Sequence, residues 1–414
     1  MQHIFYNKNI LILISGSIAA YKMLDCISQL KKYNANIKVV MSEEACKFVS
    51  PLSFEAMSGN LVLAEYNQSW VTQSSVANGA NHIAYARWAD IVLIAPASAN
   101  SIAKIACGIA DNVLLATLLA TRAKKLIAPA MNTAMLESPQ TQANLTTLKN
   151  LGFECIESRS SLLACGEMGD GALAEIDEII FRLARGLHTN IFWQGRDVII
   201  SGGGSKESID EVRFISNHSS GKQASALAIA LYTLGAKVSF VSSIFPIALP
   251  KQIAQITAQS VADFHTEIHK LIKKAESKPF VFMAAALADY APKPQKSKLK
   301  KEQVGDTLTL QCFQTQDVLS SIPPESAYKI GFKAEMDRAN APHYAKTMLD
   351  SKQCDMVCLN VITKQNPFGA DSNTINILTH DFTQSVSGSK LEVAFSIAKA
   401  CESLTKPSND SKNR

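Results

Sequence analysis

Apolar runs without polar interruptions recur along the first half of the chain. Four of them, rich in Ile, Val and Leu, lie at residues 9–15, 36–41, 90–95 and 124–128. Strands that are buried on both faces have this continuous pattern. Helical patterns follow most of these runs, at about 18–32, 98–107, 111–122 and 138–150. This alternation predicts an α/β domain with an open, doubly wound parallel sheet.

The same rhythm starts again in the second half. A new strand at 196–201 runs into three glycines, and further strands are predicted at 236–242, 280–285, 328–332 and 355–359, with a helix at 220–234. We therefore predict two Rossmann-like domains, 1–187 and 188–404, followed by a polar, disordered tail at 405–414. The first domain is expected to be flavodoxin-like, and the second to have a parallel-rich sheet. The halves share no repeated sequence, so they are not a duplication.

Length and composition narrow the possible functions. A chain of 414 residues with 47% hydrophobic residues has enough apolar surface for two cores. The net charge of +5 is spread over the chain without a dense basic stripe, which argues against a nucleic-acid partner. The apolar run at 9–15 is too short to span a membrane. The nine cysteines are scattered without a metal or disulfide spacing, which is typical of reduced cytoplasmic thiols.

Small polar residues follow the predicted strands of the first half. Ligands in such sheets bind outside the carboxyl ends of the strands, and a helix start with hydroxyl groups suits a phosphate. The turn after the first strand is Gly16-Ser17-Ile18-Ala19 and not GxGxxG, so a classical dinucleotide site is disfavoured. A plain strand–helix turn remains an alternative. His82 is a lone histidine, which is more often structural than catalytic. Cys165 lies in a glycine-rich loop, and such loops can act as lids that carry an acid–base residue.

His82, the segment Pro129-Ala130-Met131-Asn132 and the loop around Cys165 occur together in this order. The set resembles the flavin-containing cysteine decarboxylases, in the branch that acts on phosphopantothenoylcysteine. The resemblance implies an FMN site at the strand ends, formed by Gly16, Ser17, Ser42, Ser98, Asn100, Ser101 and Ala130. It further implies that His82 is the base, that Asn132 holds the substrate carboxylate and that Cys165 is the acid. Asp170 and Ala172 depart from the proline and arginine that the family has after this cysteine.

The second half carries a polar loop, Ile215 to Lys222, after the strand that ends in Gly202-Gly203-Gly204. Its small residues and its lysine suit a phosphate, but the spacing does not form a Walker A motif, and a solvated turn is the alternative. Asp289 follows another predicted strand, a position at which a carboxylate could bind a metal ion together with phosphates. One lysine of the cluster at 298–301 could reach a triphosphate. Phe332, after a further strand, could stack on a base.

These elements resemble the bacterial, CTP-using phosphopantothenate–cysteine ligases. The resemblance implies that Arg213 and Asn217 handle an acyl-cytidylate and that Lys298 helps to form it. It places the nucleotide at Asp289, Asp317, Phe332 and Lys352, with Mg²⁺ at Asp289. Three positions depart from the family pattern, namely Met348, Ala224 and the pair Thr315-Gln316.

The two resemblances together imply an enzyme of coenzyme A synthesis. 4′-Phosphopantothenate and cysteine would be joined with CTP, and the product, phosphopantothenoylcysteine, would be decarboxylated to 4′-phosphopantetheine. The family pattern also implies a large homo-oligomer, with trimeric decarboxylase cores and dimeric ligase domains. Two alternatives stay open: a flavoprotein binding or regulatory subunit with an inactive decarboxylase half, and a peptide-cysteine decarboxylase.

Overall fold

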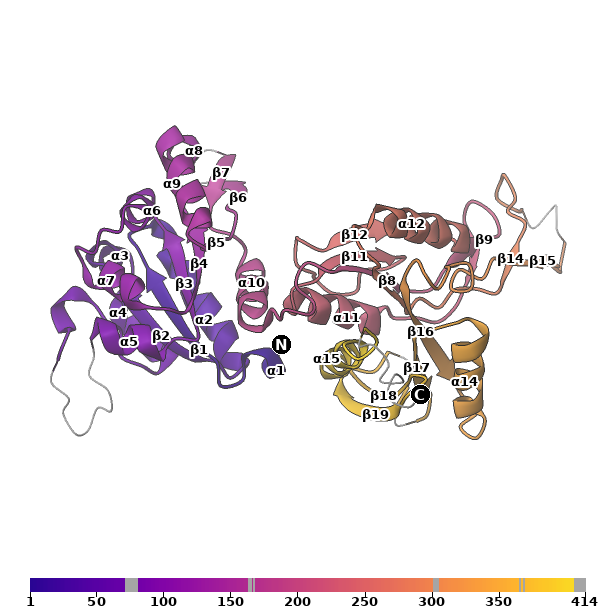
Figure 1. Cartoon of the computed structure of the whole chain (residues 1–414). Coiled ribbons are helices and arrows are strands. Elements are labelled where there is room, and N and C mark those ends of the chain that lie inside the picture. The colour runs from indigo at the N-terminus through magenta and orange to yellow at the C-terminus, as the bar shows by residue number, and fades with distance from the viewer. Residues whose placement is uncertain are drawn as a thin grey trace. The chain divides into compact units, whose positions relative to one another are not determined.

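The structure is a computed structural model that describes residues 1–70, 81–162, 166, 168–300, 305–364, 366–367 and 369–405. The chain divides into two compact units between His188 and Thr189 (Figure 1). Cys165 and residues 406–414 of the predicted tail lie outside the described residues. Within the ranges given above, no helix is long and apolar enough to cross a membrane.

The first unit is built on a five-stranded parallel sheet with the order β2-β1-β3-β4-β5. Its strands are β1 (Asn9–Ile14), β2 (Asn36–Met41), β3 (Ile91–Ala97), β4 (Lys124–Pro129) and β5 (Glu154–Cys155). All seven residues of β3 are buried, as a strand covered on both faces requires. The order is that of flavodoxin-like folds, and the predicted α/β fold class is confirmed.

Helices cover both faces of this sheet (Figure 1). Leu11 and Leu13 of β1 face a core formed with α5 (His82–Trp88), α6 (Ala99–Ala106), α7 (Val113–Ala120) and α9 (Pro139–Asn150). The opposite face is covered by α2 (Lys22–Lys32) and α10 (Ile176–His188). The shorter elements are α1 (Gln2–Phe5), η1 (Ile18–Tyr21), α3 (Glu43–Phe48), α4 (Pro51–Ser58), η2 (Glu65–Asn67), α8 (Thr133–Glu137) and the hairpin of β6 (Arg159–Leu162) and β7 (Met168–Ala172).

The second unit has an eight-stranded sheet with the order β12-β11-β8-β13-β16-β17-β18-β19. Its parallel strands are β8 (Asp197–Gly202), β11 (Lys237–Ser242), β12 (Ala254–Thr257), β13 (Phe280–Met283), β16 (Tyr328–Glu335) and β17 (Met356–Val361). An antiparallel hairpin extends this sheet, with β18 (Ser372–Leu378) and β19 (Thr383–Ser389). The six parallel strands have the doubly wound 3-2-1-4-5-6 order, so the predicted parallel-rich sheet is confirmed.

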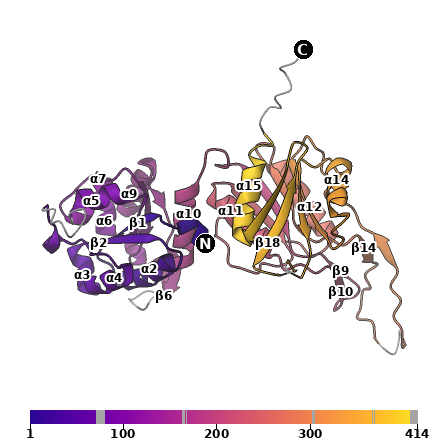
Figure 2. The ribbon, with the colours of Figure 1, turned by 90° about the horizontal axis from the view of Figure 1, so that it is seen from below.

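Two pairs of helices cover this second sheet (Figure 2). One face packs on α11 (Lys222–Thr233) and α15 (Lys390–Cys401), and the other on α12 (Val261–Lys274) and α14 (Ala341–Ser351). Two short antiparallel ribbons complete the unit. They are β9 (Lys206–Ser208) with β10 (Phe214–Ser216), and β14 (Tyr290–Pro292) with β15 (Cys312–Gln314).

Candidate active sites

The carboxyl ends of β1, β2, β3 and β4 meet at one edge of the first sheet, because these strands are parallel neighbours. The residues predicted to bind a phosphate-bearing cofactor follow these ends. Ser17 Oγ donates to the carbonyl of Ala130 at 3.3 Å, and Ala130 N donates to the carbonyl of Ala97 at 3.0 Å. The turns after β1, β3 and β4 therefore form one hydrogen-bonded edge.

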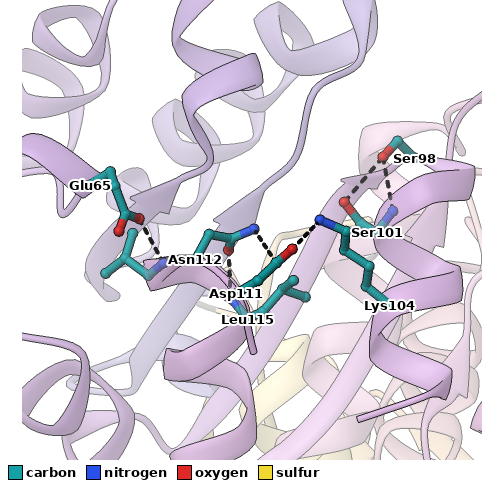
Figure 3. Close-up of polar contacts among 8 residues, drawn as sticks. Glu65, Ser98, Ser101, Lys104, Asp111, Asn112 and Leu115 are labelled. Carbon is teal, nitrogen blue, oxygen red and sulfur yellow. Dashed lines mark hydrogen bonds and ion pairs between the residues drawn. The ribbon is translucent and has the colours of Figure 1, made fainter. Parts of the chain in front are cut away.

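Serine hydroxyls at this edge cap the helices that leave the strands. Ser42 accepts a hydrogen bond from Ala45 N at 3.2 Å at the start of α3. Ser98 accepts from Ser101 N at 3.3 Å and donates to Ser101 Oγ at 3.1 Å at the start of α6 (Figure 3). Asn100 lies in the first turn of α6 and is exposed. The hydroxyls thus fix the helix starts, where main-chain N–H groups suit an anion.

Gly16 allows a close approach behind the first turn. A Cβ atom at Gly16 would lie 2.5 Å from Cβ of Glu44, so a larger residue would push α3 away from the end of β1. Ser15, which was not predicted from the sequence, is buried beside it and donates to the carbonyl of Pro96 at 2.8 Å. Ser15 Oγ also accepts from Ser98 N at 2.8 Å. A serine that directly ends a buried apolar run must find such partners, which is the signal that could have identified it.

His82 is the first residue of α5, after the N-cap Asn81, whose side chain accepts from Ala84 N at 2.9 Å. Its Nδ1 is hydrogen-bonded to Oε1 of Gln68. The Trp70 ring meets the imidazole edge-on, with 5.3 Å between ring centroids. Because Oε1 accepts a hydrogen bond, this contact assigns the proton of neutral His82 to Nδ1, which leaves Nε2 as the basic nitrogen.

Asn132 is held at the end of β4 by the β6–β7 hairpin. Its side chain caps α8 by accepting from Ala134 N at 2.9 Å. On either side of it, Met131 N donates to the carbonyl of Gly171 at 2.9 Å, and Thr133 Oγ1 donates to the carbonyl of Asp170 at 2.7 Å. The hairpin therefore fixes the position of Asn132 through β7.

The second unit has a cleft of about 620 Å³ at the carboxyl ends of β13, β16 and β17. It brings together the four residues predicted to bind the nucleotide, which lie far apart in the sequence. They are Asp289, Asp317, Phe332 and Lys352. The loop at 218–221, from the motif before α11, lines the same cleft.

Asp317 and Lys352 form an ion pair inside this cleft, with 2.8 Å between Oδ2 and Nζ. Ser320 adds two hydrogen bonds to Asp317, from its main-chain N at 3.0 Å and from its Oγ at 2.8 Å. Although burial alone would raise the pKa of Asp317, the hydrogen bonds from Lys352 and Ser320 lower the pKa below its ordinary value. The carboxylate is therefore ionised at neutral pH and holds the Lys352 ammonium in place.

Arg213 lies outside the residues that line the cleft, and its guanidinium has two partners. Nη1 donates to the buried Asp210 at 3.1 Å, and Nη2 donates to the carbonyl of Leu299 at 3.2 Å. Asp210 also accepts from Leu299 N at 3.1 Å. Arg213 and Asp210 together hold the segment that carries Lys298, whose own side chain is exposed. The predicted contact of Arg213 with an acyl intermediate stays a prediction.

The polar loop before α11 is also tied to its surroundings. Asn217 Nδ2 donates to the carbonyl of Leu287, next to the cleft, at 3.0 Å. Lys222 Nζ lies 2.7 Å from Oδ1 of Asp371 and donates to the carbonyl of Gly369 at 3.2 Å. A Cβ at Gly204 would lie 2.4 Å from the carbonyl oxygen of Asn217, so the glycine turn after β8 supports this loop.

Among the described residues, no group of three or more His, Cys, Asp or Glu side chains could hold a metal ion. Asp289, predicted to bind Mg²⁺, is an exposed carboxylate in the wall of the cleft. A single carboxylate suits Mg²⁺ only where substrate phosphates supply further oxygen ligands.

Comparison with known proteins assigns a family to both halves. Residues 3–188 match the family described as Flavoprotein, and residues 193–404 match the DNA/pantothenate metabolism flavoprotein C-terminal domain. The coenzyme A biosynthesis bifunctional protein CoaBC of Bacillus subtilis (strain 168) is 37% identical over 98% of this chain and 99% of its own length. The chain belongs to this CoaBC family. The CoaBC proteins of Haemophilus influenzae and Escherichia coli (strain K12) are 36% and 30% identical, over 94% and 90% of this chain and 95% and 91% of their own lengths.

Solved structures similar to each half were also found. The C-terminal domain of a CoaBC protein is 26% identical, covers 52% of this chain and 98% of its own, and has a TM-score of 0.43. A PPC decarboxylase complexed with pantothenoylaminoethenethiol is 31% identical, covers 43% of this chain and 96% of its own, and has a TM-score of 0.38.

Several residues that line the cleft of the second unit were not predicted from the sequence. Asn373 and Lys390 line it from β18 and from the start of α15, and Gln223 lines it from α11. Gln223 Nε2 donates to the carbonyl of Lys390 at 3.2 Å, and Asn373 Nδ2 donates to Gln223 Oε1 at 3.2 Å. The hairpin that carries Asn373 was not predicted, so nothing in the sequence pointed to Asn373 as a residue of the cleft.

Proposed function

We propose that the second unit uses CTP to join 4′-phosphopantothenate to cysteine and that the first unit decarboxylates the resulting phosphopantothenoylcysteine to 4′-phosphopantetheine. The chain is a bifunctional enzyme of coenzyme A biosynthesis, with a decarboxylase and a ligase activity, as its full-length membership of the CoaBC family requires. The observation that carries the finer proposal is the cleft that gathers Asp289, Asp317, Phe332 and Lys352 at the strand ends of one sheet.

FMN is the proposed cofactor of the first unit. The donor set at the ends of β1 and β3 suits its phosphate, because it consists of hydroxyls and helix-start N–H groups, with no acidic residue in the first turn of η1 or of α6. Ser42 caps α3, whose first turn also carries Glu43 and Glu44. The phosphate would be held by the hydroxyls of Ser17, Ser42, Ser98 and Ser101. At Gly16 and Ala130 the main chain could approach FMN closely, because the side chains there are small or absent. When bound, the flavin supplies the electron sink that decarboxylation needs and that no side chain provides.

His82 and Asn132 have separate tasks in this proposal. With Nδ1 hydrogen-bonded to Gln68, His82 presents Nε2 as the atom that accepts a proton from the substrate. Asn132 orients the substrate carboxylate, and the hydrogen bonds on both of its sides keep the turn from moving. Cys165 is proposed to return a proton at the end of the reaction.

Binding of CTP and Mg²⁺ is proposed for the cleft of the second unit. Phe332 would stack on the base, and Lys352, held by Asp317, would meet the phosphates with its ammonium. Asp289 would bind Mg²⁺ together with phosphate oxygens. Asn373 of β18 and Lys390 at the start of α15 add polar groups to the wall of the cleft.

Ligation then follows as two nucleophilic substitutions, the first at the α-phosphorus of CTP and the second at the acyl carbon. A carboxylate oxygen of 4′-phosphopantothenate attacks the α-phosphorus of CTP, and the bond to the β-phosphate oxygen breaks, which releases pyrophosphate. The amine of cysteine next attacks the acyl carbon, the bond to CMP breaks, and the amine loses a proton. Lys298 would stabilise the negative charge of the first step, while Asn217 and Arg213 would orient the acyl-cytidylate.

The test uses the purified full-length chain with 4′-phosphopantothenate, cysteine, CTP and Mg²⁺. We expect a flavin absorbance, pyrophosphate release and CO₂ release, and a lower rate when ATP replaces CTP. Absence of pyrophosphate would refute the ligase proposal. A yellow protein that makes pyrophosphate but no CO₂ would instead favour an inactive decarboxylase half, and CO₂ from a peptide that ends in cysteine would favour a peptide-cysteine decarboxylase.

We also propose a large homo-oligomer, with trimeric decarboxylase cores and paired ligase units. Support comes from aromatic side chains on the ribbons of the second unit. Tyr290, Phe313 and Phe214 have relative exposures of 60%, 54% and 52%. Aromatic side chains are enriched at protein interfaces relative to the rest of the surface. Light scattering that gives the 44.9 kDa of one chain would refute this assembly.

A further inference from the structure

Lys329 is a lysine in the interior of the second unit. It is the second residue of β16, and its relative exposure is 1%. Burying an ammonium is unfavourable unless it is hydrogen-bonded. Two main-chain carbonyls accept hydrogen bonds from its Nζ, that of Lys352 at 2.7 Å and that of Ile322 at 2.8 Å. Desolvation by burial lowers the pKa of Lys329.

The two carbonyls belong to two walls of the nucleotide cleft. Lys352 is the C-cap of α14, where a positive charge is favourable because it lies at the negative end of the helix dipole. Ile322 belongs to the turn that begins at Asp317, in which Ser321 N donates to the carbonyl of Asp317 at 3.0 Å. The ion pair between Lys352 and Asp317 joins the same two walls on the cleft side. One closed ring of contacts therefore links the buried ammonium to the ion pair.

We propose that Lys329 is a positioning residue of the nucleotide cleft, which fixes the Lys352–Asp317 ion pair by holding the carbonyls of Lys352 and Ile322. Lys329 is absent from the residues that line the cleft, so it acts through these neighbours and does not touch the nucleotide. An apolar side chain would fill this interior position without the desolvation cost of a charge. The inference rests on the proposed nucleotide site.

The test replaces Lys329 with methionine, which keeps the apolar stem and removes the donors. In pyrophosphate release by the full chain, we expect the KM for CTP to rise roughly three- to tenfold, the effect of about one lost hydrogen bond. The KM for cysteine and the rate of CO₂ release from phosphopantothenoylcysteine should stay unchanged. Lys237→Met, which removes an exposed lysine of β11, is the matched control and should change none of these values.

A double-mutant cycle separates positioning from general destabilisation. Lys352→Met alone should raise the KM for CTP, and adding Lys329→Met should then raise it little further, because Lys329 acts through Lys352. Independent effects that multiply would overturn the inference, as would an unchanged KM in Lys329→Met. If Lys352→Met itself leaves the KM for CTP unchanged, the proposed nucleotide site is refuted, and the role proposed for Lys329 is refuted as well. If the methionine variant does not fold, Lys329→Gln is measured in the same way.

Discussion

Replacing Gly171 with alanine should disable the decarboxylase half and leave the ligase half active. Gly171 lies in β7, and its carbonyl accepts the hydrogen bond from Met131 N that fixes the turn of Asn132. Its φ is +129°, a value that residues with a side chain rarely adopt. A Cβ atom there would lie 2.3 Å from the carbonyl oxygen of Met131. Because that atom belongs to the main chain, the overlap cannot be relieved by rotating a side chain.

The size of the effect follows from this overlap. An ordinary carbon contact is about 3.5 Å, so the turn would have to move by roughly 1 Å. The strained φ adds about 1–3 kcal/mol to the free energy of the folded hairpin. A displacement of about 1 Å at a substrate-positioning group lowers the rate by roughly 100-fold. We therefore expect CO₂ release by Gly171→Ala to fall about 100-fold.

The assay compares CO₂ release from phosphopantothenoylcysteine with pyrophosphate release from CTP in the same preparation. Gly152→Ala is the matched control, because Gly152 has a φ of +85° in the same unit, and a Cβ added there would have no atom of the described residues within 4 Å beyond its own chain neighbours. Gly152→Ala therefore introduces a strained φ without a steric overlap, and its rate of CO₂ release should stay at the wild-type value. A Gly171→Ala variant within threefold of the wild-type rate would refute the reasoning, as would an equal loss in Gly152→Ala.

Three further predictions concern single side chains. His82→Asn should lower CO₂ release by roughly 10²- to 10⁴-fold, as expected for a lost general base, with pyrophosphate release unchanged; loss of both would contradict independent units. Asp317→Asn should raise the KM for CTP about threefold through the lost ion pair with Lys352. Burial raises the pKa of Asp317, but the hydrogen bonds from Lys352 and Ser320 lower it more, so its pKa in the folded protein lies below the ordinary carboxyl pKa of about 4. The ion pair with Lys352 is therefore fully present above about pH 4 and is lost only when the pH falls through the lowered pKa of the folded protein. Titration of Asp317 should therefore leave the KM for CTP unchanged between about pH 5 and 7. A rise of the KM within that range that disappears in Asp317→Asn would contradict an ionised Asp317. Asp210→Ala should lower ligation, with CO₂ release unchanged, because it frees the segment of Lys298; an unchanged ligation rate would count against a role for that segment.

The central strands of both sheets could be predicted from the sequence because both of their faces are buried. The predicted strand at 9–15 extends one residue beyond β1, and the predicted strand at 90–95 overlaps β3 from Ile91 to Ala95. Such strands need apolar residues at nearly every position, which gives a continuous signal. The helix predicted at 18–32 is correct from Lys22 onward, but its first turn, η1, is a 3₁₀ helix.

The hairpin of β18 and β19 could not be predicted in this way. In β19, Val386 is the single buried residue, and the rest of the strand is polar or small. Its conformation depends on pairing with β18 over seven positions, which a local pattern does not encode. Because the hairpin was missed, its contribution of Asn373 to the cleft was missed as well.

The candidate sites were predictable where they follow strand ends and unpredictable where they depend on long-range partners. Ser42 and Ser98 are caps directly after strands, so their place follows from the topology alone. Arg213 instead meets Leu299, 86 residues further along the chain. Only the folded structure reveals that its guanidinium supports the segment of Lys298.

The candidate sites of the two units differ in where their ion pairs lie, and this difference matches the chemistry proposed for each. The strand ends of the first unit are capped by neutral hydroxyls and amides, with Glu43 and Glu44 in the first turn of α3, and the ion pair between Lys124 and Glu154 lies at the amino end of β4. In the second unit, the ion pair of Lys352 and Asp317 lies within the cleft itself, with a buried ammonium behind it. A flavin reaction needs an oriented substrate and a cofactor that carries the electrons. Transfer of a nucleotide from a triphosphate needs fixed positive charge, which the second unit supplies through lysines that carbonyls and a carboxylate hold in place.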